Sequence, residues 1–262
     1  MSRSPGLTLI DELLAPLSES NDVQVWRGQA SNQWPLQPGL YRRIAKFSDN
    51  ASARIDETAV LAYELDLLAE ANGLGYYDSN RVKTMVRLQH HGAATRLLDV
   101  SRNPFVALWF ATDEGPAGAD GVVFHFAISP DRDYHYYDSS SWDSITSNDH
   151  AGKPILYFPD AVDGRVRAQQ SGFLTTVLAS HREFSDDFLS AGPQLGITKA
   201  VIPAELKPEL RQYLQVAQGM SAYTIYPDFQ GYALAHSATA PFPRSFAELH
   251  DGRNGLFPNQ KR

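Results

Sequence analysis

The 262-residue chain contains no cysteine. This absence excludes a disulfide framework, a cysteine-ligated zinc site and a thiol nucleophile. The N-terminus does not have the basic segment followed by an apolar one that marks a secretory signal, and no apolar run reaches the roughly 20 residues of a membrane-spanning helix. We therefore expect a cytoplasmic protein that has no membrane partner. An effector delivered by a route without a signal sequence would have the same features.

Two common nucleotide-binding signatures are also missing. The chain has neither the Gly-x-Gly-x-x-Gly fingerprint of dinucleotide-binding folds nor the Gly-x-x-x-x-Gly-Lys of phosphate loops. A net charge of −7 argues against a broad nucleic-acid-binding surface, because phosphate binding needs clustered lysine and arginine. A local basic groove around Arg42, Arg43 and Lys46 remains compatible with the sequence.

The composition is that of a folded globular protein, with 43% hydrophobic and 20% charged residues. Apolar periodicity predicts both helices and strands, without a regular βαβ repeat. We expect helices near residues 8–17, 55–72, 81–90, 105–112 and 206–218, and strands near 23–26, 95–100, 122–128, 198–202 and 223–226. This pattern favours an α+β fold, a single domain with a central mixed or antiparallel sheet. We divide the chain into an N-terminal helix (1–19), the main domain (20–237) and a C-terminal tail (238–262).

The first motif is Trp26-Arg27-Gly28-Gln29, at the end of a short apolar strand. A guanidinium binds phosphate through two parallel hydrogen bonds, and a glycine leaves room for a ligand to approach the backbone. The motif therefore favours an anion site. The alternative is that Arg27 pairs with a buried carboxylate and braces a turn.

The second motif runs from Gln89 to Ser101 and leads into an apolar helix. Strand alternation places Thr95, Asp99 and Ser101 on one face and Arg96 on the other. We expect the first three to face one cleft together with Arg27. In the alternative, Asp99 pairs with Arg27 or Arg96 and Ser101 caps the helix.

Other polar groups are less specific. Adjacent His90 and His91 point in different directions on a helix, with no partner at helical spacing, so we expect no metal site. His90 remains a candidate for a ligand hydrogen bond. Gln169 and Gln170 offer uncharged donors and acceptors, although they also suit a solvent-exposed strand edge. Asp228 is a natural N-cap for a short helix, which makes its motif structural.

These motifs together resemble the FRG domain, a family named for its aromatic-Arg-Gly triplet and widespread in bacteria and phage. The resemblance spans about residues 20–236 and rests on Trp26–Gln29, Pro38–Arg43, Gln89–Asp99, Arg165–Phe173 and Pro227–Gly231. The order of the motifs is similar to that of ADP-ribosyltransferases. This similarity implies an ADP-ribosyltransferase-like fold, NAD as cofactor and a macromolecular acceptor, protein or nucleic acid. It also implies a toxin or defence effector.

The resemblance further implies roles for individual residues. The NAD contacts would be Arg27, Gly28, Gln29, His90, Thr95 and Arg96, and the catalytic groups would be Arg27, Asp99, Ser101 and Gln169. The third motif departs from the enzymes, because Gln169-Gln170 lacks their catalytic glutamate. Asp99 or Glu183 would have to supply the anion, or the domain binds a nucleotide without turning it over.

Two other functions stay open from the sequence. The main alternative is a non-catalytic module that binds nucleic acid or protein through Arg27, Arg42 and Arg43. A nuclease-like hydrolase has the least support, since the chain shows no clustered carboxylates for a metal.

Overall fold

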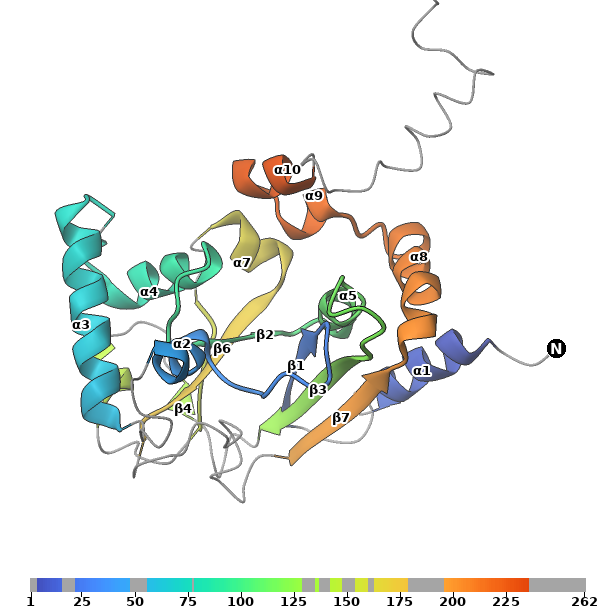
Figure 1. Cartoon of the computed structure of the whole chain (residues 1–262), viewed down its shortest axis with the longest axis horizontal. Coiled ribbons are helices and arrows are strands. Elements are labelled where there is room, and N and C mark those ends of the chain that lie inside the picture. The colour runs from blue at the N-terminus through green and yellow to red at the C-terminus, as the bar shows by residue number, and fades with distance from the viewer. Residues whose placement is uncertain are drawn as a thin grey trace, which may run out of the picture.

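The computed structural model describes residues 4–15, 22–47, 56–76, 78–128, 135–136, 142–147, 154–159, 163–178 and 196–235. In this part of the chain, seven strands form one open sheet of order β4-β5-β6-β2-β1-β3-β7 (Figure 1). β4 and β5 are parallel, and every other neighbouring pair is antiparallel. The predicted α+β fold with a central mixed sheet is therefore confirmed.

The strands divide the sheet into two well-paired halves. Their bounds are β1 Val23–Gln29, β2 Leu98–Ser101, β3 Gly121–Ile128, β4 His135–Tyr136, β5 Pro154–Tyr157, β6 Ser171–Thr176 and β7 Gly196–Ile202. β1 pairs with β3 along its whole length, and β2 pairs with β6 along its whole length. β1 and β2 share one register pair, Trp26 with Ser101. We call this narrow contact the β1–β2 junction.

The helices cover both faces of the sheet. Their bounds are α1 Pro5–Leu14, α2 Gly39–Phe47, α3 Glu57–Gly73, α4 Arg81–His90, α5 Pro104–Ala111, α6 Trp142–Ile145, α7 Gly164–Ala168, α8 Lys207–Ala217, α9 Ala222–Ile225 and α10 Phe229–Ala235. Local signals fix α4 and α5, since the side chains of Asn80 and Asn103 accept hydrogen bonds from their first-turn N–H groups. Pro104 opens α5, as expected for a position whose N–H needs no partner.

Alternation along β1 shows how the two faces are buried. Val25 packs in a cluster with Leu40 of α2, whereas Trp26 packs in another with Leu108 of α5. Ile10 of α1 belongs to the second cluster, which also includes residues of β7 and α8. The N-terminal helix thus shares the core of the sheet.

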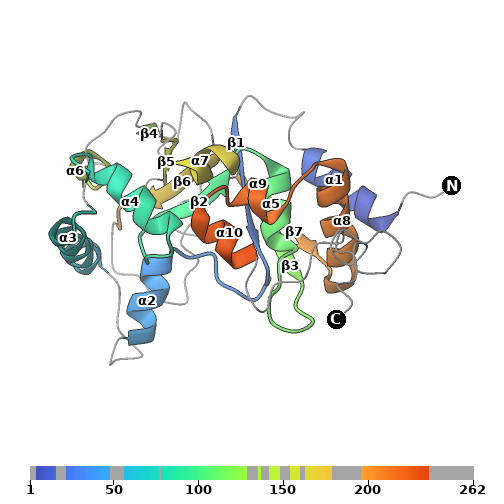
Figure 2. The same cartoon turned by 90° about the horizontal axis from the view of Figure 1, so that it is seen from above.

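The arrangement of helices around the sheet is clear in two views. α3 and α4 lie at one end and α1 and α8 at the other, beside β7 (Figures 1 and 2). α9 and α10 lie over the central part, above β2 and α5 (Figures 1 and 2). This places the C-terminal helices over the β1–β2 junction.

Two of the strands expected from the sequence differ in the structure. Residues 223–226, expected as a strand, lie mainly in α9, because Ser221 and Thr224 form a reciprocal capping box. The expected strand 95–100 begins only at Leu98, since the Thr95 hydroxyl accepts a hydrogen bond from the Leu97 N–H and forms a turn. The predicted tail, 238–262, lies outside the described residues.

Candidate functional site

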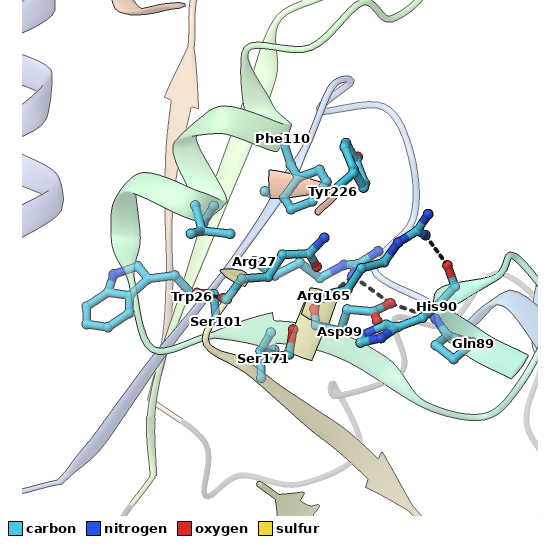
Figure 3. A pocket seen from close by; sticks show the side chains of 15 residues that line it. Trp26, Arg27, Gln89, His90, Asp99, Ser101, Phe110, Arg165, Ser171 and Tyr226 are labelled. Carbon is cyan, nitrogen blue, oxygen red and sulfur yellow. Dashed lines mark hydrogen bonds and ion pairs between the residues drawn. The ribbon is translucent and has the colours of Figure 1, made fainter. Parts of the chain in front are cut away.

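A cavity of about 240 Å³ lies at the β1–β2 junction (Figure 3). Its walls come from β1, the end of α4, β2, α5, α7 with the turn after it and the first residue of β6, and the residue after α9. The lining residues are Trp26, Arg27, Gly28, Gln89, His90, Asp99, Val100, Ser101, Val106, Ala107, Phe110, Arg165, Gln169, Ser171 and Tyr226. The junction therefore collects residues from both halves of the sheet.

Arg27 spans the gap between β1 and β2. Its Nη1 donates to the backbone carbonyl of Asp99 at 2.8 Å, and its Nε donates to Gln29 Oε1 at 3.3 Å. Nη2 has no hydrogen-bond partner among the described residues, and 18% of the side chain is exposed. Burial lowers the pKa of Arg27, as does the charge of Arg42, while Asp99 opposes the shift. An arginine nevertheless stays protonated at neutral pH, so one face of a fixed cation remains available.

Asp99 is held by a short chain of hydrogen bonds. Thr95 Oγ1 donates to Gln89 Oε1 at 2.6 Å, and Gln89 Nε2 donates to Asp99 Oδ2 at 2.6 Å. Arg27 Nη1 lies 3.9 Å from the same oxygen. The chain fixes the orientation of the amide and the carboxylate together. The Arg27–Asp99 pairing expected from the sequence is thus present, and within the described part of the protein Oδ1 of Asp99 makes no hydrogen bond.

Gly28 is explained by packing. A Cβ at this position would lie 1.8 Å from the backbone oxygen of Ala107 and 2.8 Å from the backbone nitrogen of Ala111. The missing side chain therefore lets α5 lie directly on β1. Gly28 lines the cavity, but close helix–strand packing rather than ligand approach requires the glycine.

Ser101 and Gln169 tie the cavity walls together. The Ser101 hydroxyl donates to the backbone carbonyl of Gln169 at 2.7 Å and accepts from the Asn103 N–H at 2.9 Å. The Gln169 amide donates to the carbonyl of Ile225 at 3.0 Å. Each polar group thus has a structural partner. The solvent-exposed strand edge considered for Gln169 is not found, because the residue is buried and ends α7.

Arg165 and Tyr226 were not identified as site residues from the sequence. Arg165 forms a two-point ion pair with Asp228 and donates to the backbone carbonyl of His90. Its guanidinium lies 5.2 Å from the centre of the Tyr226 ring, which meets Phe110 edge-on at 6.2 Å. Burial raises the pKa of Tyr226 to about 12. A neutral phenol and a phenyl ring therefore close one side of the cavity.

Asp228 also has the structural role predicted for it. Its Oδ1 accepts from the Gly231 N–H at 2.7 Å at the start of α10. Its partner Arg165 is noticeable in the sequence because it precedes the glutamine motif. However, a pairing across 63 residues cannot be predicted from local spacing.

His90, the last residue of α4, lines the cavity with a ring whose side chain is 3% exposed. Its Nδ1 lies 3.3 Å from Asp163 Oδ2. Its ring packs against Phe173, with 5.5 Å between the ring centres. The sequence predicted a ligand contact for His90 but not its carboxylate partner.

Three residues proposed to contact the cofactor do not line the cavity. Arg96 is fully buried and bonds both carboxylate oxygens of Glu64 and one of Glu57. Burial alone would lower the pKa of Arg96, but the two carboxylates raise it above its ordinary value. Thr95 is also fully buried and supports Gln89, and Gln29 supports Arg27 while donating to the Trp34 carbonyl.

The structure places Arg96 in a brace instead of a ligand site. Arg96 lies before β2 begins, so strand alternation does not place it, and its side chain points into the protein, where both of its acidic partners lie on α3. Of the four residues expected to face one cleft, Arg27, Asp99 and Ser101 line the cavity, whereas Thr95 lies behind it. Glu183 lies outside the described residues.

Among the described residues, no group of three or more histidine and acidic side chains is placed to hold a metal ion. No helix in that part of the chain has the length and apolar character needed to cross a membrane.

The fold and the cavity define an α+β domain with a candidate anion-binding site at the junction of two sheet halves. Residues 22–119 match the family model of the FRG domain. The match includes Arg27, His90 and Asp99, whereas the motifs at 165–173 and 227–231 lie beyond it. No curated protein and no solved structure matches the chain.

Proposed function

We propose that the cavity binds NAD⁺ and that the protein transfers ADP-ribose to a macromolecular acceptor. The observation that carries this proposal is the pairing of Arg27 and Asp99 in one cavity, where Arg27 Nη2 and Asp99 Oδ1 have no hydrogen-bond partner among the described residues. A fixed cation suits the diphosphate of NAD⁺. A fixed carboxylate suits the positive charge that develops on the ribose when nicotinamide leaves.

The size of the cavity limits which part of NAD⁺ it encloses. Its volume of about 240 Å³ is below the roughly 300–1,000 Å³ of typical ligand pockets. We therefore place only the nicotinamide ribose inside, with the nicotinamide against Phe110 and Tyr226. The remainder of the dinucleotide extends outward toward Arg42, whose charge is close enough to affect the pKa of Arg27.

Asp99 is the best candidate for the anion that the third motif lacks. The Gln169 amide is neutral and is already bonded to the carbonyl of Ile225. The Asp99 carboxylate is held by Gln89 and Arg27 and is 37% exposed, so it can meet a ligand. Prior orientation of a charged group is what makes it effective in a transition state.

Release of nicotinamide from labelled NAD⁺ tests this function, with protein, RNA and DNA supplied as acceptors. Asp99→Asn should lower the rate by about 10²-fold or more, the scale for one lost electrostatic contact. Asp66→Asn, an exposed carboxylate on α3, is the matched control and should leave the rate unchanged. Gln169→Ala should also slow the reaction, because it frees α9 from the cavity wall. An Asp99→Asn variant as fast as wild type would refute the assignment.

A non-catalytic module is the second candidate, favoured by the exposed Arg42 and Arg43 on α2. Thermal unfolding with NAD⁺, with short RNA and with short DNA separates the two functions. Stabilisation by nucleic acid but not by NAD⁺ would favour the module. Stabilisation by NAD⁺ and labelling of an acceptor would support the transferase, a toxin or defence effector that draws on cytoplasmic NAD⁺. Growth arrest on expression in bacteria would test that biological role.

A further inference from the structure

The His90–Asp163 pair has the geometry of an oriented imidazole in the cavity wall. Asp163 caps α7 by accepting the Val166 N–H at 2.9 Å with Oδ1, and its other oxygen meets His90 Nδ1 at 3.3 Å. Burial alone would raise the pKa of Asp163, but the Val166 N–H and His90 hold it below the usual range of a carboxyl. The carboxylate is therefore ionised, so His90 Nδ1 is the nitrogen that donates.

This arrangement leaves the other ring nitrogen with a lone pair. Nε2 of His90 is buried and has no hydrogen-bond partner among the described residues. A buried polar atom without a partner costs about 1–3 kcal/mol, so such atoms in folded proteins call for an explanation. A hydrogen bond from a bound molecule would supply the partner. In Figure 3 the labelled His90 lies among the residues that line the cavity.

The proton accepted by Nε2 does not come from a serine of the cavity. The Ser101 hydroxyl already donates to the Gln169 carbonyl, and neither Ser101 nor Ser171 forms a hydrogen bond with His90. A serine nucleophile activated by histidine needs that bond. The group that donates to Nε2 is therefore a ligand hydroxyl rather than a protein nucleophile.

We infer that His90 is the general base that deprotonates a hydroxyl acceptor, with Asp163 as the positioning residue that holds its tautomer. The inference rests on the proposed ADP-ribose transfer. The acceptor O–H gives its proton to Nε2 while its oxygen bonds to C1′ of the nicotinamide ribose. The C1′–N bond breaks, its electron pair stays on nicotinamide, which leaves neutral, and the imidazolium releases the proton to water.

The inference also names the acceptor class. A carboxylate acceptor is already ionised at neutral pH and needs no base, whereas a hydroxyl, of a side chain, a ribose or water, does. The product is then free ADP-ribose or an O-glycosidic conjugate that resists neutral hydroxylamine. A conjugate cleaved by neutral hydroxylamine would be a carboxylate ester and would overturn the inference.

The test compares full-length wild type with His90→Gln, Asp163→Asn and the control His91→Gln, an exposed neighbour outside the cavity. For each protein, the Kd for NAD⁺, the melting temperature and the pH profile of nicotinamide release are measured. His90→Gln should bind NAD⁺ with a similar Kd but lower kcat by about 10²-fold or more. The kcat of Asp163→Asn should lie between those of wild type and His90→Gln, because the tautomer of His90 is no longer fixed. The loss of rate at low pH in wild type should be absent from the residual rate of His90→Gln.

Nitrogen NMR of imidazole-labelled protein gives a readout besides activity. Wild-type His90 should carry its proton on Nδ1, and the Nε2 signal should shift when NAD⁺ and the acceptor bind. If wild type cleaves NAD⁺ and folded His90→Gln cleaves it equally fast with the same pH profile, the inference is overturned and the proposed function stands. If His90→Gln does not fold, the inference is overturned instead by an Asp163→Asn variant that cleaves NAD⁺ as fast as wild type. If wild type neither binds nor cleaves NAD⁺, both are overturned.

Discussion

Replacement of Arg27 by lysine tests whether the guanidinium fork, rather than positive charge alone, binds the ligand. Lysine keeps the charge but offers a single ammonium on a flexible stem. In the structure, Arg27 donates a hydrogen bond from Nη1 to the Asp99 carbonyl and another from Nε to Gln29 Oε1. Among the described residues Nη2 has no partner, so it can bind a ligand. An ammonium cannot bond the carbonyl and a phosphate in the same geometry. We therefore expect Arg27→Lys to lose one charge-assisted hydrogen bond.

The size of the effect follows from that single bond. A hydrogen bond to a charged group contributes about 1.5–3 kcal/mol, which raises the Kd for NAD⁺ about 10- to 150-fold. Arg27→Ala should weaken binding at least as much. Its free energy of unfolding should also fall by about 1–3 kcal/mol, because the partly buried Asp99 carbonyl loses its donor. A domain of ordinary stability, about 5–15 kcal/mol, remains folded after such a loss.

Calorimetric titration with NAD⁺ measures the binding, and thermal unfolding of the same samples measures the stability. Arg43→Lys is the matched control, since that arginine is exposed on α2 and lies outside the cavity. An Arg27→Lys variant that binds NAD⁺ like wild type would refute the reasoning. It would mean that Arg27 only braces β1 against β2.

Three further predictions concern the surroundings of the site. Gly28→Ala should lower the free energy of unfolding by about 3 kcal/mol or more in chemical denaturation, because the new methyl group meets the backbone of Ala107; wild-type stability would disprove the packing role. Glu64→Gln should lower the free energy of unfolding by about 3–5 kcal/mol, because the buried charge of Arg96 is then incompletely compensated. Its Kd for NAD⁺ should be unchanged where the protein is folded, and a raised Kd would return Arg96 to the ligand site. Burial lowers the pKa of His125 below its ordinary 6.5, so the unfolded chain binds the proton more readily. Stability should therefore be full above about pH 6.5 and fall as the pH drops below it, with a smaller fall in His125→Gln; equal pH dependence of the two proteins would contradict this.

Local signals predicted much of the fold. The bounds of α4 were predicted to the residue and those of α5 to within one residue; in both cases a cap and a clear periodicity lie within a few residues of each other. Alternation in β2 placed Asp99 and Ser101 on the cavity side. These features depend on neighbours in sequence. The short helix α9 was missed because its aromatic residues favoured a strand, while Ser221 and its capping partner determined the result.

Contacts between distant segments account for the remaining errors at the site. Nothing near Arg96 in the sequence reveals Glu64, which lies 32 residues earlier and determines its burial. The same holds for Arg165 and Asp228, 63 residues apart, and for His90 and Asp163, 73 residues apart. Gly28 stood out in the sequence as a place where a ligand could approach the backbone. In the structure the glycine is required by its contact with the backbone of α5, which is distant in sequence.

The division of the sheet at the β1–β2 junction has a consequence for what counts as a folding unit. The family match ends at residue 119, before β3 begins at Gly121, and it therefore includes β1 and β2 without the strands that pair fully with them. A fragment cut to residues 22–119 would keep one register pair of the sheet and would expose both long edges to other chains. It would also lose Gln169, Arg165 and Tyr226 from the cavity. The matched segment is thus shorter than the stretch of chain that builds the cavity, and residues after β3 are needed to complete the walls around Arg27 and Asp99.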